Sequence, residues 1–348
     1  MADFHKVHIQ EVTQETANAV SVLFDIPNNL QQDFNFNAGQ YITLQTNIKG
    51  EEVRRAYSIC STPKSGAIRV AIKAVENGTF SQYATSDLKA GDEIEIAAPE
   101  GRFELIPEPN KNYIAFAAGS GITPILSMLK TVLEDEASTT FTLVYGNRTA
   151  ADTIFYDELN ALKEQYPNQF KLHYIFSRED VKNQLRGRID KSVTNYFVKN
   201  MYKETTFDAA FLCGPEEMIN EVTNTLKTNN FTKENIHFEL FTVSVDEEAA
   251  AEVKEGTIEI TIMLDDEETT FNMQQTDDIL AAALRNDLDP PYSCQGGVCS
   301  SCLAKVTKGK AVMVKNTILT DGEVEEGFIL TCQAHPTTPT IAIDFDDV

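Results

Sequence analysis

The sequence contains no apolar run of the roughly 18 residues that a membrane-spanning helix requires. Its start, MADFHKVHIQ, also lacks the basic stretch followed by an apolar stretch that marks a secretory signal. These absences predict a cytoplasmic protein with no membrane partner. In that reducing compartment the six cysteines are not expected to form disulfides, so a cluster of cysteines would indicate metal or redox chemistry.

Positive charge is scarce, with 29 Lys and Arg against 53 Asp and Glu and a formal net charge of −24 at pH 7. A chain of this charge repels phosphates, which argues against nucleic acid as a partner. Residues 243–348 alone hold 21 acidic and 6 basic side chains. This excess indicates either simple solubility or an acidic face that attracts a basic partner protein.

The chain has 348 residues, which are too many for one ordinary hydrophobic core. The pattern of predicted strands and helices changes along it and indicates several domains. Residues 1–106 contain short alternating segments between turn signals, which predicts an antiparallel β-barrel, with a β-sandwich as the alternative. In residues 107–242 buried-type strands alternate with helices, which predicts a doubly wound parallel sheet. The acidic, alanine-rich residues 243–256 read as a linker to a last domain, 257–348, of mixed α+β type.

Three cysteines lie within nine residues of the stretch PPYSCQGGVCSSC, and a fourth follows 30 residues later. The four positions are Cys294, Cys299, Cys302 and Cys332. A four-cysteine zinc ribbon prefers two C-x2-C pairs, and only one is present, although structural zinc or free thiols stay the alternative. The x4–x2 spacing with one distant cysteine is that of a plant-type [2Fe–2S] cluster. The domain resembles plant-type ferredoxins of β-grasp fold.

Two motifs in the first domain point to a flavin. In RRAYSIC, a strand would place Arg55 and Tyr57 on one face and Ser58 on the other. In GTFSQYA, Gly78 and Ser81 would begin a helix whose backbone N–H groups can hold a pyrophosphate. Together R-x-Y-S and G-x-F-S resemble the flavin-binding signature of the ferredoxin–NADP reductase superfamily.

That resemblance implies bound FAD and a role for each motif residue. Arg55 would pair with the flavin pyrophosphate, Tyr57 would pack on the isoalloxazine, and Ser58 would hydrogen-bond near its N5 atom. The residues that the resemblance places along the flavin chain and its phosphates are Ile72, Lys73, Gly78, Phe80 and Ser81.

The stretch AAGSGITPILSM, residues 117–128, follows a predicted strand and opens a predicted helix. It is not the ordinary dinucleotide fingerprint G-x-G-x-x-G. Gly119 and Gly121 permit close backbone approach, Thr123 offers a hydroxyl, and Pro124 fits a first helical turn. A structural turn is the alternative, but the stretch resembles the nicotinamide-binding loop of the same superfamily.

The stretch LCGPEEMI matches a second nicotinamide motif, C-G-P-x-x-M. By itself Cys213 could be an inert buried thiol. The resemblance instead places Cys213 beside the nicotinamide C4, where it positions the ring for hydride transfer, with Gly214 and Pro215 completing the cofactor contact. It also places Glu239 and Phe241, in HFELF, near the flavin.

The stretch IFSRED bears on the choice of nucleotide. Ser177 and Arg178 resemble the pair that grips the 2′-phosphate of NADP, and arginine matches phosphate geometry. Glu179, one residue later, points toward NAD instead. NADPH is the expected nucleotide, with NADH as the alternative. Cys60 matches no motif and is expected in the core.

The order of barrel, nucleotide domain and ferredoxin domain covers the whole chain. It resembles the reductase components of multicomponent oxygenases, including those of phenylacetyl-CoA epoxidases, hydroxylases and dioxygenases. This implies hydride transfer from NADPH to FAD, then single electrons through [2Fe–2S] to a partner, expected to be a di-iron oxygenase with a basic docking face. Two alternatives remain: a general NAD(P)H reductase for another electron carrier, and a non-catalytic, zinc-stabilised nucleotide-binding module.

Overall fold

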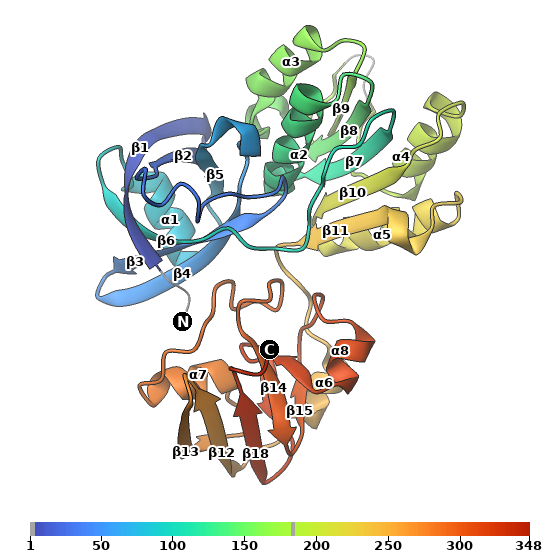
Figure 1. Ribbon diagram of the computed structural model, residues 1–348. Helices are drawn as coiled ribbons and strands as arrows, with labels where there is room; N and C mark the ends of the chain where they lie inside the picture. Colours follow the sequence, from blue (N-terminus) through green and yellow to red (C-terminus); the bar gives the residue numbers. More distant parts are fainter. Residues whose placement is uncertain (1–3, 182–184) are drawn as a thin grey trace. The chain divides into compact units, whose positions relative to one another are not determined.

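The computed structural model describes residues 4–181 and 185–348, and it divides into two compact units (Figure 1). The first unit is Phe4–Glu239, and the second begins at Leu240 and runs to Val348. Parts of the predicted domains 1–106 and 107–242, namely residues 1–3 and 182–184, lie outside the described residues.

The first unit begins with an antiparallel six-stranded sheet in the order β4-β3-β6-β1-β2-β5. Its strands are β1 Phe4–Thr16, β2 Ala19–Asp25, β3 Tyr41–Ile48, β4 Glu51–Ser58, β5 Ile68–Lys73 and β6 Glu93–Ala97. Its helical segments are η1 Pro63–Ser65 and α1 Thr79–Ser86. A bridge between Ile59 and Val70 joins the end of β4 to β5, so the two outer strands meet and close the predicted barrel.

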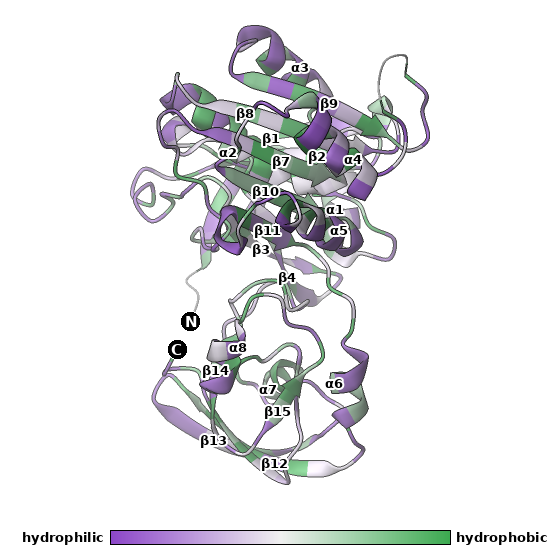
Figure 2. Ribbon diagram, turned by 90° about the vertical axis from the view of Figure 1, so that its right-hand side faces the viewer, coloured by the Kyte–Doolittle hydropathy of each residue, from purple (hydrophilic) through white to green (hydrophobic). Residues whose placement is uncertain are grey.

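A five-stranded parallel sheet follows, with the order β11-β10-β7-β8-β9. Its strands are β7 Asn112–Ala118, β8 Thr140–Asn147, β9 Phe170–Phe176, β10 Ala209–Gly214 and β11 Ile236–Leu240. The helical segments are η2 Gly119–Gly121, α2 Ile122–Asp135, η3 Ala150–Asp152, α3 Tyr156–Gln165, α4 Lys191–Asn195, η4 Tyr196–Met201, α5 Glu216–Lys227 and η5 Lys233–Asn235. Strands β7 and β8 are buried along nearly their whole length. Figure 2, coloured by hydropathy, shows hydrophobic (green) segments in the strands of this sheet.

The strand order of this sheet reverses between β7 and β10. From β7 the chain proceeds to β8 and β9 on one side, and it returns as β10 on the other side. In an open parallel sheet, ligands bind at the carboxyl ends of the strands that flank such a reversal. The predicted nicotinamide motifs begin at these two strand ends, at Ala118 and Gly214.

The barrel and the parallel sheet share one apolar core. It combines Cys60 and Phe103 from the barrel part with Leu126, Met128 and Phe211 of the parallel-sheet part. Polar contacts cross the same boundary. The Ser127 hydroxyl donates to the Ser61 carbonyl at 2.6 Å, and both side chains are buried. Cys60 is fully buried, as expected for a core residue.

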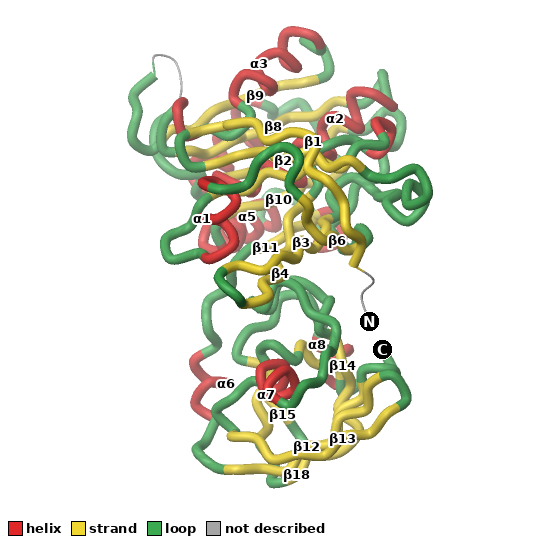
Figure 3. The backbone as a smooth tube through the Cα atoms, turned by 90° about the vertical axis from the view of Figure 1, so that its left-hand side faces the viewer, coloured by secondary structure: helices red, strands yellow, loops and turns green. Residues whose placement is uncertain are grey.

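The second unit is built on a mixed sheet in the order β13-β12-β18-β14-β16, beside a small β15-β17 pair (Figure 3). Its strands are β12 Thr257–Leu264, β13 Glu267–Gln274, β14 Leu303–Lys308, β15 Ala311–Met313, β16 Phe328–Leu330, β17 Ala334–Pro336 and β18 Thr340–Asp344. Its helices are α6 Glu247–Glu252, α7 Ile279–Arg285 and α8 Asp321–Glu325. Strands β12 and β18 are parallel and central, as the predicted mixed α+β domain requires.

The segment 243–256, predicted as a linker, contains helix α6. The Asp246 side chain caps it by accepting hydrogen bonds from the backbone of Glu248 and Ala249. The Asp246 backbone N–H donates to the Val314 carbonyl at 2.7 Å, which ties the helix to the end of β15. Much of the segment therefore packs as part of the second unit.

No helix in the described part of the chain combines the length and the apolar character needed to cross a membrane.

Candidate functional site

Strand β4 carries the predicted flavin residues to the end of the barrel. The Tyr57 ring packs against the buried Phe80 ring of α1, with centroids 5.6 Å apart. Burial raises the pKa of Tyr57 well above its usual range, so the phenol stays neutral. Arg55 is half-buried, and its guanidinium donates to the Arg54 carbonyl at 2.6 Å. This surface offers one aromatic face and one cation to a ligand.

Gly78 is the N-cap residue of helix α1, next to the helix start that the sequence predicts. A Cβ atom at Gly78 would lie 2.4 Å from the Ser81 hydroxyl and from a Val75 methyl group, so a larger residue here would have to displace both side chains. The Ser81 hydroxyl accepts a hydrogen bond from the Val75 backbone N–H at 3.2 Å, which ties the loop before the helix to its first turn. The Ile72 side chain, in contrast, is fully buried in the barrel core, so only its backbone is available to a ligand.

Three elements bring the predicted catalytic residues together. Ser58 ends β4, Cys213 lies near the end of β10, and Glu239 lies on β11. The Ser58 hydroxyl donates to the Glu239 carboxyl group at 3.2 Å. The Glu239 charge acts on Cys213, whose pKa is raised mainly by burial and further by that carboxylate.

Burial also governs the carboxyl group itself. It raises the pKa of Glu239 from 4.5 to about 8, and the Ser58 hydrogen bond offsets this only in part. At neutral pH the group therefore carries a proton. The site combines a neutral thiol, a hydroxyl and a protonated acid.

The predicted nicotinamide loop packs directly against the Cys213 backbone. A Cβ atom at Gly121 would lie 2.2 Å from the Cys213 carbonyl oxygen. Gly119 has a φ of +56°, and its carbonyl accepts a hydrogen bond from the buried Tyr145 hydroxyl at 2.8 Å. The Thr123 hydroxyl donates to the Ser120 carbonyl at 3.1 Å at the start of α2. Pro124 is buried in the first turn of this helix.

The structure places Lys73 at this loop. Its Nζ atom would lie 3.7 Å from a Cβ atom built on Gly119. Burial and the nearby Arg148 lower the pKa of Lys73. Sequence reasoning missed Arg148. The signal that could have found it is a cation directly after β8, because polar residues at the carboxyl ends of parallel strands face the ligand site.

The predicted 2′-phosphate residues follow β9. Backbone hydrogen bonds from Ser177 to the Asn147 carbonyl (3.0 Å) and from Arg178 to the Arg148 carbonyl (2.9 Å) hold them beside the end of β8. The Glu179 carboxylate accepts a hydrogen bond from the Ala150 backbone at 2.7 Å. This acid is therefore bound at the start of η3, whereas the two arginine side chains are exposed.

Strand β10 leads into the second nicotinamide motif at Gly214. A Cβ atom there would meet Met218 at 2.7 Å and Ala118 at 3.2 Å, and Pro215 caps α5. Phe241 belongs to the other unit, where it is 37% exposed.

The four predicted cluster ligands converge in one loop region of the second unit. The Cys302 and Cys332 sulfurs are 3.3 Å apart, and the Cys294 thiol interacts with Cys299 and Cys332. All but Cys294 are buried. The Gly296 backbone N–H donates to the Cys294 sulfur at 3.3 Å, which is the contact a thiolate ligand needs. Across residues 4–181 and 185–348, no three His, Cys, Asp or Glu side chains are arranged as ligands of a single metal ion.

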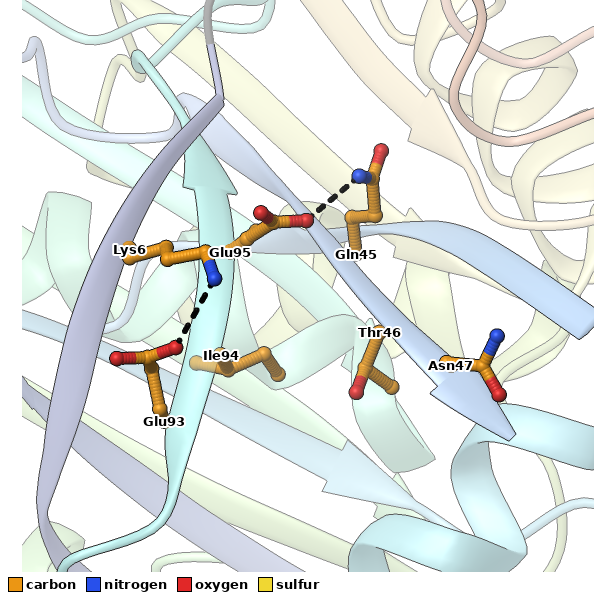
Figure 4. Close-up of a pocket in the computed structure, with 7 residues that line it drawn as sticks. All are labelled: Lys6, Gln45, Thr46, Asn47, Glu93, Ile94 and Glu95. Atoms are coloured by element: carbon orange, nitrogen blue, oxygen red, sulfur yellow. Dashed lines mark hydrogen bonds and ion pairs between the residues drawn. The ribbon is translucent and has the colours of Figure 1, made fainter. Parts of the chain in front are cut away.

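A pocket on the barrel surface lies apart from these residues (Figure 4). It is lined by Lys6, Gln45, Thr46, Asn47, Glu93, Ile94 and Glu95. Lys6 pairs with Glu93 at 3.3 Å, and the Gln45 amide donates to Glu95 at 2.7 Å. These polar groups bind one another, so the pocket is not part of the candidate site.

Comparison with family models divides the chain into three regions. Residues 6–105 match the oxidoreductase FAD-binding domain, 116–224 the oxidoreductase NAD-binding domain, and 262–337 the 2Fe-2S iron-sulfur cluster binding domain. The residues that converge in the structure fit these groups. The aromatic and glycine-lined surface suits FAD, the glycine loops suit a nucleotide, and the four sulfurs suit a cluster.

Two curated relatives match this chain over nearly their whole length. The chain is 38% identical over 351 residues to a subunit of the 1,2-phenylacetyl-CoA epoxidase of Escherichia coli K12, with 99% of each chain covered. It is 31% identical to the ferredoxin reductase component of 3-ketosteroid-9-alpha-monooxygenase from Rhodococcus rhodochrous, covering 97% of this chain and 95% of the relative. Among solved structures, phthalate dioxygenase reductase shares the fold, with a TM-score of 0.66, 23% identity and 98% coverage of both chains. The chain therefore belongs to the NAD(P)H-dependent, FAD- and [2Fe–2S]-containing reductase components of multicomponent oxygenases.

Proposed function

We propose that this chain transfers electrons from NADPH, through FAD and a [2Fe–2S] cluster held by Cys294, Cys299, Cys302 and Cys332, to the oxygenase component of a phenylacetyl-CoA epoxidase. The observation that carries the assignment of the hydride-transfer site is the meeting of Ser58, Cys213 and Glu239 at the end of barrel strand β4. When bound, FAD converts a two-electron donor into single electrons, and the cluster passes them on one at a time. The identity to the Escherichia coli epoxidase component supports the choice of partner.

Ser58 and Glu239 set the charge and the hydrogen bonding of the proposed hydride-transfer site. Because the pKa of Glu239 is raised to about 8, its carboxyl group holds a proton at neutral pH. With FAD bound, a neutral acid at this position would add no negative charge to the site that accepts electrons. The Ser58 hydroxyl, bonded to Glu239, orients this carboxyl group.

The proposed role of Cys213 is steric, and it requires no reaction of the thiol. Its side chain is fully buried and burial raises the pKa of the thiol, so no thiolate forms at neutral pH. Its backbone is locked against Gly121, which fixes the sulfur relative to the nucleotide loop. The residue thereby positions the nicotinamide ring for transfer.

The two arginines at the ends of β8 and β9 support NADPH as the nucleotide. Arg148 and Arg178 are neighbours through a 2.9 Å backbone hydrogen bond, and both side chains are exposed to bind a phosphate. Glu179, which would favour NADH if it faced the ribose, is bound to the Ala150 backbone. The two exposed guanidinium groups therefore favour NADPH more than the Glu179 carboxylate, which is already hydrogen-bonded, favours NADH.

Stepwise anaerobic reduction followed by visible spectroscopy tests the nucleotide and the electron path. NADPH is expected to bleach the flavin bands and then the cluster bands at lower concentrations than NADH. The Arg178→Ala variant should lose about 10- to 100-fold in NADPH affinity, the value of one charge-assisted contact, without losing NADH affinity. Equal response of the wild-type protein to both nucleotides would contradict the NADPH assignment.

The proposed partner is an oxygenase with a basic docking face, and the proposed location is the cytoplasm. Residues 243–348 carry 21 acidic and 6 basic side chains, which supports electrostatic encounter with such a face. Turnover with a purified phenylacetyl-CoA epoxidase oxygenase should therefore fall as salt rises from about 50 to about 500 mM, because screening shortens the reach of charge. Salt-independent coupling, or no coupling with this oxygenase, would contradict the partner assignment.

A further inference from the structure

Gln333 directly follows the last cysteine of the cluster loop and belongs to none of the flavin, nucleotide or cluster motifs. Its side chain is only 9% exposed. Its amide nitrogen donates two hydrogen bonds to backbone carbonyls, one to Gln295 at 2.9 Å and one to Cys332 at 2.7 Å. One side chain therefore connects the two ends of the cluster-binding region, which are separated by 37 positions in the sequence.

The bond to Gln295 fixes a peptide that also contacts a sulfur. The Gln295 carbonyl and the Gly296 N–H belong to the same planar, trans peptide, so they point in opposite directions. On one side the carbonyl accepts the Gln333 amide. On the other side the N–H donates to the Cys294 sulfur at 3.3 Å. Holding the carbonyl therefore aims the N–H.

The Gln295–Gly296 peptide needs a hydrogen bond from outside the loop, because the residues around it restrict its conformation little. Gln295 has a φ of +53°, a left-handed conformation that a residue with a side chain seldom adopts. It is followed by Gly296 and Gly297, which restrict the backbone least. Without a partner for the carbonyl, the peptide can rotate and turn its oxygen toward the sulfur.

The Gln333 side chain is itself held in place. Its backbone N–H donates to the Leu330 carbonyl at 2.9 Å, and its carbonyl accepts from Val314 at 2.9 Å. Its Cγ atom lies so near Gly297 that a Cβ atom there would be 3.1 Å away. The amide is therefore a rigid donor.

We propose that Gln333 is a positioning residue that keeps the Gly296 N–H aimed at the Cys294 sulfur and so raises the reduction potential of the cluster. Reduction adds one negative charge, part of which resides on the sulfurs, and an N–H donor stabilises that charge. Rotation of the peptide would replace the donor with a carbonyl dipole of the wrong sign. This inference rests on the proposed assignment of the four cysteines as cluster ligands.

The test measures the cluster midpoint potential in the full-length protein by redox titration with EPR detection. Gln333→Leu removes the donor, and Gln333→Glu replaces the donor with an acceptor of the same size. Each is expected to lower the reduction equilibrium constant of the cluster about tenfold, which is about 59 mV for one electron. The matched control is Gln275→Leu, because the Gln275 amide also donates to a backbone carbonyl in this unit, that of Pro336 at 3.1 Å. Its potential should equal that of the wild-type protein.

A second readout follows the hydrogen bond itself. In reduced samples exchanged into D2O, pulsed EPR should detect a strongly coupled exchangeable proton in the wild-type protein, and this signal should weaken in both Gln333 variants. Variants that purify without cluster are reconstituted anaerobically with iron and sulfide before measurement.

The outcomes separate the inference from the proposed function. Unchanged potential and proton coupling in the Gln333 variants would overturn the inference, as would variants that cannot be reconstituted, because the residue would then be a structural requirement only. Iron and sulfide analysis of the wild-type protein tests the cluster assignment independently. A wild-type protein without two irons per chain would refute that assignment whatever the variants do.

Discussion

Glu239 offers the sharpest prediction, because its pKa of about 8 falls within an accessible pH range. If hydride transfer requires the protonated acid, the competent fraction is about 90% at pH 7, about 50% at pH 8 and about 10% at pH 9. The rate of flavin reduction by NADPH in anaerobic stopped-flow experiments should fall accordingly. Glu239→Gln keeps a neutral group of the same shape, so its rate should stay level over this range.

The raised pKa of Glu239 also makes the stability of the protein depend on pH. The folded-state pKa is raised above the unfolded value of 4.5, so the folded protein holds the proton more tightly. The stabilisation from this proton is complete below pH 4.5 and is lost as the pH rises through 8, by at most about 1.4 kcal/mol per pH unit. Urea unfolding followed by flavin fluorescence should therefore show Glu239→Gln gaining relative to the wild-type protein between about pH 6 and 8.

A matched control distinguishes this site from general surface charge. Glu234 lies just before β11, is exposed, and has its pKa lowered by local hydrogen bonds. Glu234→Gln should leave the rate profile of flavin reduction unchanged. Identical profiles for the wild-type protein and Glu239→Gln would refute the reasoning, since Glu239 would then not be the titrating group.

Two further substitutions probe the nucleotide loop and the barrel contact. Gly121→Ala places a Cβ atom 2.2 Å from the Cys213 carbonyl oxygen. The rate of flavin reduction by NADPH in stopped-flow experiments should therefore fall more than about 100-fold, while the FAD content is retained. Full activity of this variant would contradict the close packing. Arg69→Met removes ion pairs to Glu15 (2.7 Å) and Glu158 (3.2 Å) from a side chain that is 25% exposed. After allowance for solvent screening, the free energy of unfolding measured in urea should fall by about 2 kcal/mol. Lys64→Met, at an exposed ion pair, is the control and should cost less than about 0.5 kcal/mol.

The sequence predicts most of the fold because its patterns are local. Strand β12 alternates exposed and buried residues along most of its length, and β7 is an almost continuous apolar run, so each pattern identifies its type of sheet. The four cysteines are equally local, since their spacing alone indicates a cluster. The alanine-rich segment is less clear, because helix α6 depends on an Asp246 cap and on packing with β15 rather than on apolar periodicity.

The rest of the site depends on contacts between distant residues, which no local pattern encodes. Lys73 is expected along the flavin, yet it approaches Gly119, 46 positions later. The carboxylate of Glu179 is bound by Ala150, and this depends on how the ends of β8 and β9 pair. Gln333 acquires its role only because the fold brings its side-chain amide to the Gln295 carbonyl, 38 positions earlier in the sequence.

The contact between Ser127 and Ser61 has a consequence for the kinetics of turnover. A buried hydroxyl bonded at 2.6 Å, within a core drawn from both the barrel and the parallel sheet, leaves these two parts without an independent hinge. Opening them would expose the shared core to water and leave that hydroxyl unpaired. We therefore expect one nucleotide to be exchanged for the next through movements of side chains and short loops, without a slow rearrangement of the barrel against the parallel sheet.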